Sequence, residues 1–236
     1  MNNKITKILK LLKKNLYKVD AHTFLSDVFE CGAIAISNRF DFRNYEKREK
    51  RYKEIINKYD KQMQNLIVEV FTEIYQLLIN QNENHVFNDY LGEIYMNSNT
   101  QNKKTGQFFT PYHLSKVTAS LSIDENIIKD IITQNEVLTL LEPACGSGGM
   151  IVAAIELLSN KYDFNYASNL FVDATDIDKR CVHMTYLQLA MLGVPAVIKH
   201  GDTLSLDIWD TWFTPSYLMQ YPKFLKYITK NKKEKK

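Results

Sequence analysis

Apolar residues recur with helical spacing in the first part of this chain and gather in short runs in the second, and the change comes near residue 100. Over residues 4–18 the apolar positions fall on one face of a helix, and lysines occupy the rest. Residues 23–37 predict a second helix, and residues 44–80 predict one long helix or two consecutive ones. We therefore expect residues 1–95 to form a helical region without strands. The apolar face of the first helix comprises Ile5, Ile8, Leu9, Leu12 and Leu16.

Two features of this helical region bear on partners. The lysine-rich first helix favours docking on the body with solvated lysines, and contact with nucleic acid is the alternative. Within residues 44–80, apolar and aromatic side chains alternate in steps of four and three, which predicts a seam along another helix or along a partner chain. The seam residues are Tyr52, Ile56, Tyr59, Met63, Leu66 and Val70.

After a polar linker at residues 97–105, the pattern predicts an α/β unit over residues 96–222. A helix at 115–121 follows Pro111, and then short apolar runs alternate with helical segments. Strand, helix, strand, helix, strand is typical of a parallel sheet with right-handed crossovers. A lysine-rich tail, residues 223–236, follows. The predicted strands are 136–141, 171–176 and 196–200, and the helices between them are 150–158 and 181–192.

Composition limits the function classes further. The 236 residues are 45% hydrophobic with a net charge of +3, which suits one ordinary core and permits nucleic acid as a partner. The odd number of cysteines favours a reducing cytoplasm. No apolar run is long enough to span a membrane, and the five histidines lack metal-ligand spacing. We therefore expect neither a membrane segment nor a metal.

Candidate chemistry lies where each predicted strand ends. The first strand runs into residues 141–149, Leu-Glu-Pro-Ala-Cys-Gly-Ser-Gly-Gly, whose glycines let a backbone approach a ligand closely at a helix N-terminus. Asp176 ends the second strand and can accept hydrogen bonds from ribose hydroxyls, whereas Asp178 suits the N-cap of the next helix better. Asp202 follows the third strand, where it is either an adenine-amine acceptor or a turn residue. All three positions fall on one edge of the sheet.

These residues resemble the N6-adenine DNA methyltransferases, the group that includes the modification subunit of type I restriction systems. Residues 142–149 look like their motif I, and residues 106–111, Gly-Gln-Phe-Phe-Thr-Pro, look like their motif X. The resemblance covers residues 89–204, about half of the chain. It implies a truncated Rossmann-like fold that binds S-adenosylmethionine and acts on or with DNA, within a restriction-modification system.

The resemblance also implies roles for individual residues. Phe108, Thr110 and Pro111 would flank the methionine moiety, and Asp176 and Ile177 would hold the ribose and adenine. Asp202, with Thr203 beside it, would hold the adenine amine. The amino-acid part would bind the remaining loop residues, which are Glu142, Pro143, Ala144, Cys145, Gly146, Ser147 and Gly148.

The sequence departs from the family at its catalytic motif, Asn/Asp/Ser-Pro-Pro-Tyr/Phe, because no Pro-Pro occurs. The nearest segment, Thr214-Pro215-Ser216-Tyr217, keeps a proline and the aromatic ring that would stack on a flipped base, but lacks the amide or carboxylate. Thr214, Pro215 and Tyr217 are therefore weak catalytic candidates. Few residues follow His200, so the sheet is expected to leave an edge of its first strand open. We expect the helical region, residues 207–225 or a second chain to cover that edge.

Three functions remain open at this point. The first is an adenine-N6 DNA methyltransferase, acting alone or completed by a partner. The second is a non-catalytic cofactor-binding regulator or assembly subunit, and the third is a DNA-binding or interaction module with a relic site. The retained loop, Asp176 and Asp202 disfavour the third, and the missing Pro-Pro favours the second for the isolated chain. An RNA or protein substrate also stays open, because the fold does not choose it. The heptad seam and open edge both predict a protein partner or a homo-oligomer.

Overall fold

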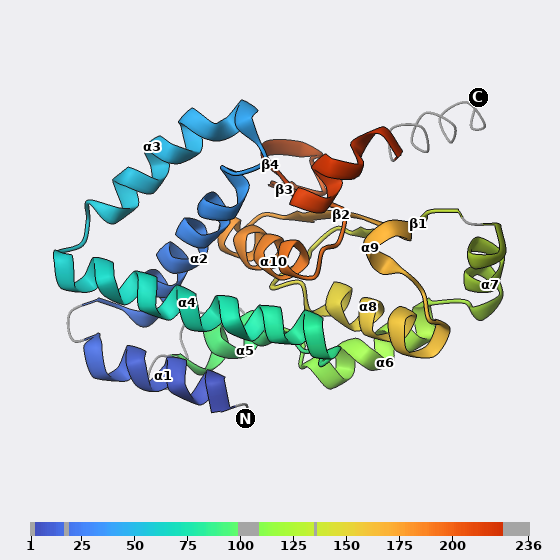
Figure 1. The fold of residues 1–236 in the computed structure, drawn as a ribbon, viewed down its shortest axis with the longest axis horizontal. Helices are drawn as coiled ribbons and strands as arrows, with labels where there is room; N and C mark the ends of the chain where they lie inside the picture. Colours follow the sequence, from blue (N-terminus) through green and yellow to red (C-terminus); the bar gives the residue numbers. More distant parts are fainter. Residues whose placement is uncertain (1–2, 17–18, 99–108, 135, 224–236) are drawn as a thin grey trace.

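A computed structural model describes residues 3–16, 19–98, 109–134 and 136–223. An N-terminal group of helices leads into a sheet whose strands alternate with helices (Figure 1). The N-terminal helices are α1 (Asn3–Asn15), α2 (Ala21–Ser37), the 3-10 turn η1 (Phe42–Asn44), α3 (Tyr45–Ile56), α4 (Lys61–Asn84) and α5 (Tyr90–Asn97). The remaining elements are α6 (Tyr112–Ser122), α7 (Glu125–Gln134), β1 (Leu138–Glu142), α8 (Gly149–Tyr162), α9 (Tyr166–Asn169), β2 (Leu170–Asp176), α10 (Lys179–Met191), β3 (Ala196–Asp202) and β4 (Asp207–Phe213), followed by a helix over residues 215–223.

The first helix docks through its apolar face, as its pattern predicts. Ile5, Ile8 and Leu12 are fully or almost fully buried, and α1 contacts α4 and α5. Lys7 forms an exposed ion pair with Glu73 of α4 at 2.6 Å, so part of the lysine face is engaged within the chain. The docking interpretation is confirmed, and nucleic-acid contact by the other lysines stays a prediction.

The heptad seam is divided between two helices, because α3 ends at Ile56 and α4 begins at Lys61, with Asp60 as its N-cap. The side chains of Leu66 and Val70 are buried in the main hydrophobic core, and α4 contacts α1, α2 and α10. Tyr59 donates its hydroxyl to Asp27 of α2 at 2.9 Å. The seam is therefore largely filled within the chain, and it no longer argues for a partner.

The sheet has the order β1-β2-β3-β4, with β1, β2 and β3 parallel and β4 antiparallel to β3. The predicted α/β class and three parallel strands are confirmed. Side chains alternate across β2: Leu170, Val172 and Ala174 join the main core, while Phe171 joins a small cluster on the other face. That second face is partly polar, because Asp173 of β2 pairs with Lys199 of β3 at 2.6 Å.

One of the three alternatives expected to cover the open edge of β1 is wrong. Residues 207–213 do not cover β1; they pair with β3 at the opposite edge. In the part of the chain that the structure describes, no strand pairs with the outer edge of β1. A pocket of about 380 Å³ lies there, lined by β1 and by side chains of α6, α7 and α8. The free edge therefore persists, flanked by helices that follow residue 109.

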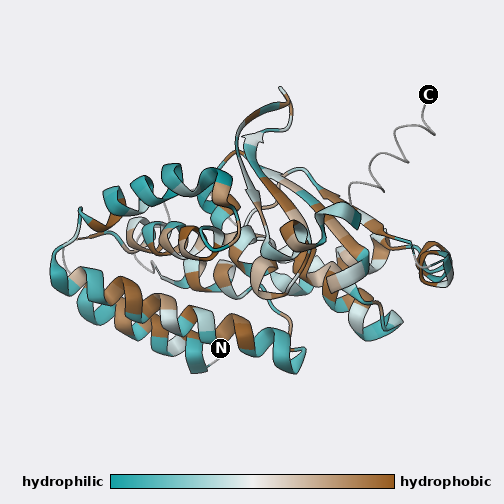
Figure 2. Ribbon diagram, turned by 45° about the horizontal axis from the view of Figure 1, so that its top comes forward, coloured by the Kyte–Doolittle hydropathy of each residue, from teal (hydrophilic) through white to brown (hydrophobic). Residues whose placement is uncertain are grey.

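The helical region and the sheet share one hydrophobic core, which runs from Ile5 to Trp212. The expected boundary at residues 95 and 96 falls inside α5, which contacts α10. Figure 2 shows α3 as a largely hydrophilic helix; it reaches this core through Ile55, which is fully buried. None of the described helices combines the length and apolar character needed to cross a membrane. The expected tail, residues 223–236, lies outside the described residues except for Lys223.

Candidate cofactor site at the carboxyl edge of the sheet

The loop between β1 and α8 is held at successive backbone atoms. Gly146 and Gly148 both adopt positive φ, at 54° and 93°, which glycine tolerates without strain. The amide of Cys145 donates to the carbonyl of Thr175 in β2 at 2.9 Å, and the hydroxyl of Thr185 in α10 donates to the carbonyl of Gly146 at 3.0 Å. The loop is thereby fixed against both neighbouring elements of the fold.

Asp176 occupies the centre of this edge. One carboxylate oxygen accepts from the amide of Gly146 and the other from the amide of Asp178, each at 2.8 Å. The side chain is only 9% exposed, and burial raises the pKa of Asp176, an effect that both backbone hydrogen bonds oppose. Each carboxylate oxygen has a second lone pair. Asp176 therefore orders the glycine loop and can still accept from a ligand hydroxyl.

Asp178 has the capping role that the sequence favours. Its side chain accepts from the amide of Arg180 at 2.9 Å as the N-cap of α10, and it also holds the Arg180 guanidinium. That guanidinium donates to the hydroxyl of Tyr95 in α5 at 2.8 Å. The start of α10 is thus linked to α5 through Arg180 and Tyr95. The sequence predicted no role for α5 at the site.

The predicted binding residues surround Asp176. The side chain of Glu142 accepts from the amide of Ala144 at 3.2 Å, and burial raises the pKa of Glu142. Asp202 accepts from the amide of Leu204 at 2.8 Å, which is the turn role that the sequence left open. Thr203 donates to the carbonyl of Pro143 at 2.6 Å and so joins the end of β3 to the glycine loop. Pro143, Ala144, Ile177 and Thr203 are exposed, giving the edge an accessible rim.

Two predicted loop residues turn their side chains away from this rim. The thiol of Cys145 is buried, and burial raises the pKa of Cys145 to about 12. Ser147 is 2% exposed and donates its hydroxyl to the buried carboxylate of Asp89. These two residues can therefore meet a ligand only through their backbone.

The segment expected to close over the site is only partly described, because Phe108 lies outside the described residues. Thr110 and Pro111 are exposed, and Pro111 is the N-cap of α6. Phe109 lies against the loop: a Cβ added to Gly146 would sit 3.3 Å from its ring. Its ring also contacts that of Tyr95, with centroids 5.9 Å apart. Phe109 therefore places an aromatic ring at the site, whereas the sequence predicted its neighbour Phe108 for that role.

The weak catalytic candidates lie at the other end of the strands. The Thr214 hydroxyl accepts from the amide of Ala196, where β3 begins, and donates to the carbonyl of Val194. Tyr217 packs in the small cluster with Val137 and Phe171, which lie at the start of β1 and β2. Pro215 is buried in the first turn of the last described helix. The structure therefore separates Thr214, Pro215 and Tyr217 from the loop by the length of the sheet and gives them packing and capping roles.

The sequence matches the family model of N-6 DNA methylases over residues 82–236. The chain belongs to this family. Among solved structures it is similar to a protein of Listeria monocytogenes described as a candidate class I S-adenosylmethionine-dependent methyltransferase, with 15% identity and a TM-score of 0.49. That similarity covers 89% of this chain and 57% of the other, so this chain spans little more than half of that protein's length. A search of curated proteins gives no match.

The carboxyl edge of the sheet in this N-6 DNA methylase family member is acidic. Three acidic side chains, Glu142, Asp176 and Asp202, stand at the ends of three adjacent parallel strands. Carboxylates accept hydrogen bonds from hydroxyl and amino groups, and they repel phosphates. The edge therefore suits a ligand that carries hydroxyls and amino groups. No cluster of His, Cys, Asp and Glu suited to a metal is found among the described residues.

Proposed function

We propose that the chain binds S-adenosylmethionine at the carboxyl edge of β1, β2 and β3, and that it serves adenine-N6 methylation of DNA. The observation that carries the proposal is the pair of hydrogen bonds by which Asp176 orders the glycine loop while keeping lone pairs for a ribose. When bound, this cofactor supplies a methyl group on a sulfonium centre. DNA is the proposed partner, in a modification system of the cytoplasm.

The residues suit this cofactor by their chemistry. Asp176 would hold the ribose hydroxyls, Asp202 the adenine amine, and Glu142 the amino group of the methionine part. The exposed side chain of Ile177 would lie against the adenine. An acid at the position of Asp176 is common to this cofactor and to dinucleotides. Glu142 favours this cofactor, because it places a carboxylate at the glycine loop, where the pyrophosphate of a dinucleotide needs an electropositive cradle.

Calorimetric titration of S-adenosylmethionine into wild type, Asp176→Ala and Asp173→Ala tests the binding. Asp173 is a matched control, because it lies on the same strand with its side chain on the other face, paired to Lys199. We expect Asp176→Ala to weaken binding by at least about 100-fold, as expected for hydrogen bonds to a charged group. Asp173→Ala should bind as wild type does. A folded wild type that does not bind contradicts the proposal.

A second function is favoured by one observation, the position of Thr214-Pro215-Ser216-Tyr217 at the opposite end of the sheet. With no Pro-Pro in the sequence, nothing in this chain matches the residues that hold a flipped adenine in the family. The isolated chain would then bind the cofactor as a regulatory or assembly subunit and transfer no methyl group. Transfer of labelled methyl groups to adenine-containing DNA, with RNA and protein as parallel substrates, decides between the two functions.

A further inference from the structure

A buried carboxylate lies behind the glycine loop, on the side turned to the protein interior. Asp89 is 5% exposed and is the N-cap of α5, where it accepts from the amide of Gly92 at 3.0 Å. It also accepts from the hydroxyl of Ser147, in the glycine loop, and from the amide nitrogen of Gln188, in α10, at 2.9 Å. The same Gln188 nitrogen donates to the carbonyl of Ser147 at 2.6 Å. We call Asp89, Ser147 and Gln188 the Asp89 cluster.

The cluster joins three elements that are distant in sequence. Ser147 and Gln188 follow Asp89 by 58 and 99 residues, so only the tertiary fold brings them together. Each side chain is almost or fully buried, at 5%, 2% and 0% exposure. The side-chain oxygen of Gln188 is buried without a hydrogen-bond partner among the described residues, while the other polar atoms of the cluster bond to one another. Buried hydrogen bonds fix a geometry more sharply than exposed ones, because losing one partner leaves the others unpaired.

Two glycines make room for this contact. A Cβ added to Gly149, the first residue of α8, would lie 2.8 Å from a carboxylate oxygen of Asp89. A Cβ added to Gly92, in α5, would lie 2.7 Å from the hydroxyl oxygen of Ser147. Any larger residue at either position would push the start of α5 away from the loop. The absence of a side chain at both positions therefore permits the close approach of α5 to the cofactor loop.

The two sides of the loop are thus held by different carboxylates. Asp176 binds the amide of Gly146 from the end of β2, at the rim where the cofactor would lie. On the other side, Asp89 accepts from the hydroxyl of the next residue, Ser147, and Gln188 donates to its carbonyl. We propose that Asp89 is a positioning residue: by fixing Ser147 from behind, it sets the loop conformation that binds the cofactor and couples α5 to the site. The affinity measurements that test this inference rest on the proposed function, whereas measurements on the ligand-free protein do not.

Substitution of Asp89 separates positioning from general stability. Asp89→Ala removes all three hydrogen bonds of this side chain, and we expect S-adenosylmethionine affinity to fall at least about tenfold, roughly the effect of leaving one buried hydrogen-bonding group without its partner. Asp89→Asn should bind within about threefold of wild type. Its oxygen can still accept from Gly92 and Gln188, and its amide can donate to the Ser147 oxygen.

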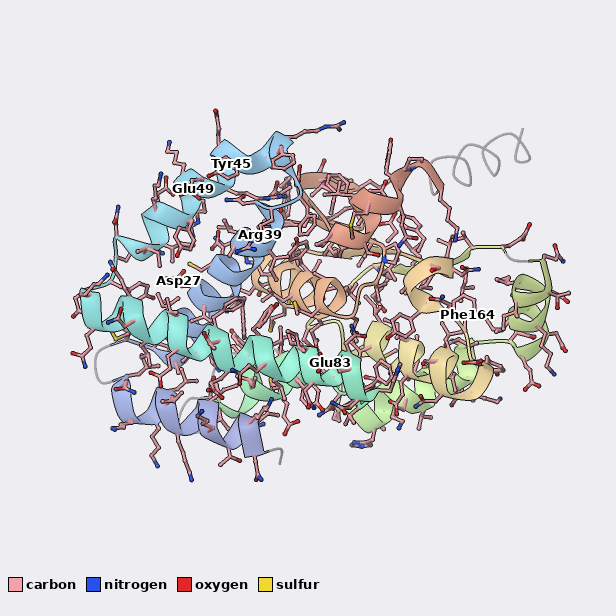
Figure 3. All side chains as sticks on the ribbon, in the orientation of Figure 1. Asp27, Arg39, Tyr45, Glu49, Glu83 and Phe164 are labelled. Carbon is pink, nitrogen blue, oxygen red and sulfur yellow. The ribbon has the colours of Figure 1, made fainter. Side chains whose placement is uncertain are left out.

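Asp27→Ala is the matched control. Asp27 lies on α2 among the N-terminal helices (Figure 3) and is also a buried aspartate, at 6% exposure. It accepts from the Tyr59 hydroxyl and pairs with Lys58. Its loss should lower thermal stability and leave cofactor affinity within about threefold. If Asp89→Ala is too unstable to study, Ser147→Ala removes only the loop side of the contact and should still weaken binding. The double variant should bind no more weakly than Asp89→Ala alone, because both changes remove one interaction.

Hydrogen exchange of the amides of residues 145–148 in the ligand-free protein gives a readout that needs no cofactor. We expect faster exchange in Asp89→Ala, and no change in Asp27→Ala or Asp89→Asn. Equal effects of Asp89→Ala and Asp27→Ala, or an Asn variant as defective as the Ala variant, would overturn the inference. If wild type binds no S-adenosylmethionine, the proposed function fails, and the exchange rates alone still decide whether Asp89 positions the loop.

Discussion

The carboxylate of Asp176 and the amide of Gly146 form a 2.8 Å hydrogen bond that spans 30 residues of sequence. It joins the end of β2 to the loop after β1, which are two of the three strand ends where the sequence predicts the cofactor. The bond links the residue proposed to hold the ribose to the loop proposed to hold the methionine part. Protonation of this one carboxylate should therefore change the whole site.

We expect S-adenosylmethionine affinity to fall on acidification, with a midpoint above the usual aspartate range of about 4. Burial raises the pKa of Asp176, and the nearby Asp178 raises it further, while backbone hydrogen bonds and His200 oppose the shift. A protonated Asp176 is a poorer acceptor for the Gly146 amide and for a ribose hydroxyl. Titrations from pH 7 to pH 4 on wild type and Asp176→Asn measure this. The variant should be weak throughout and clearly less dependent on pH than wild type, with the remaining dependence coming from Glu142, whose pKa burial also raises; an equally steep decline in both proteins would contradict the prediction.

Thr214→Val should cost stability and leave the site intact. The valine keeps the shape but removes the hydroxyl that bonds to the Ala196 amide and the Val194 carbonyl, leaving both without that partner. A loss of about 1–3 kcal/mol in the free energy of unfolding follows. Urea denaturation measures it, and S-adenosylmethionine affinity should stay within about twofold. A large loss of affinity at unchanged stability would contradict this prediction and indicate that residues 214–217 contribute to the cofactor site.

Acidification should destabilise the fold through His183. This ring is 3% exposed and lies edge-on to Trp212, with centroids 4.9 Å apart, and burial lowers the pKa of His183 to about 4. Between pH 6.5 and 4 the unfolded chain binds the proton and the folded chain does not, so stability present above this window is lost as the pH falls through it.

The loss attributable to this side chain is on the order of 3 kcal/mol. Denaturation curves at pH 7 and pH 4 on wild type and His183→Gln measure it as the difference between the two pH dependences. The nearby Glu30, Lys179, Asp210 and His200 are present in both proteins, so their titration largely cancels. Equal pH dependence in the two proteins would show that His183 is protonated without penalty.

The thiols should be unreactive in the native protein. Cys31, Cys145 and Cys181 are all buried, and burial raises the pKa of Cys31 and of Cys145 to about 12. At pH 8 a thiol with that pKa carries roughly a thousandfold less reactive thiolate than an ordinary cysteine. A colorimetric thiol reagent should label all three cysteines in denaturant and label them far more slowly without it. Rapid native labelling would contradict their assignment as core residues.

Much of the fold follows from local patterns in the sequence. The helices at 4–18, 23–37 and 181–192 and the three parallel strands lie close to their predicted ranges, because periodic apolar residues mark a buried face whatever it packs on. Most of the elements that were missed are short or weakly patterned, but α7, also missed, is a ten-residue helix with apolar residues at helical spacing. Helix α9 has four residues, α5 has eight, and β4 buries Trp212 alone among its side chains.

The sequence by itself determined the glycine loop, the acids at the strand ends and the choice of Asp178 as a cap, because parallel strands bring their carboxyl ends to one edge wherever each strand lies. Only the tertiary structure decided what stands behind the loop and what lies far from it. Asp89 and Gln188 meet Ser147 across long stretches of chain, and the antiparallel course of β4 carries Thr214 back to the opposite edge. Such contacts depend on how whole elements pack, and no local pattern records them.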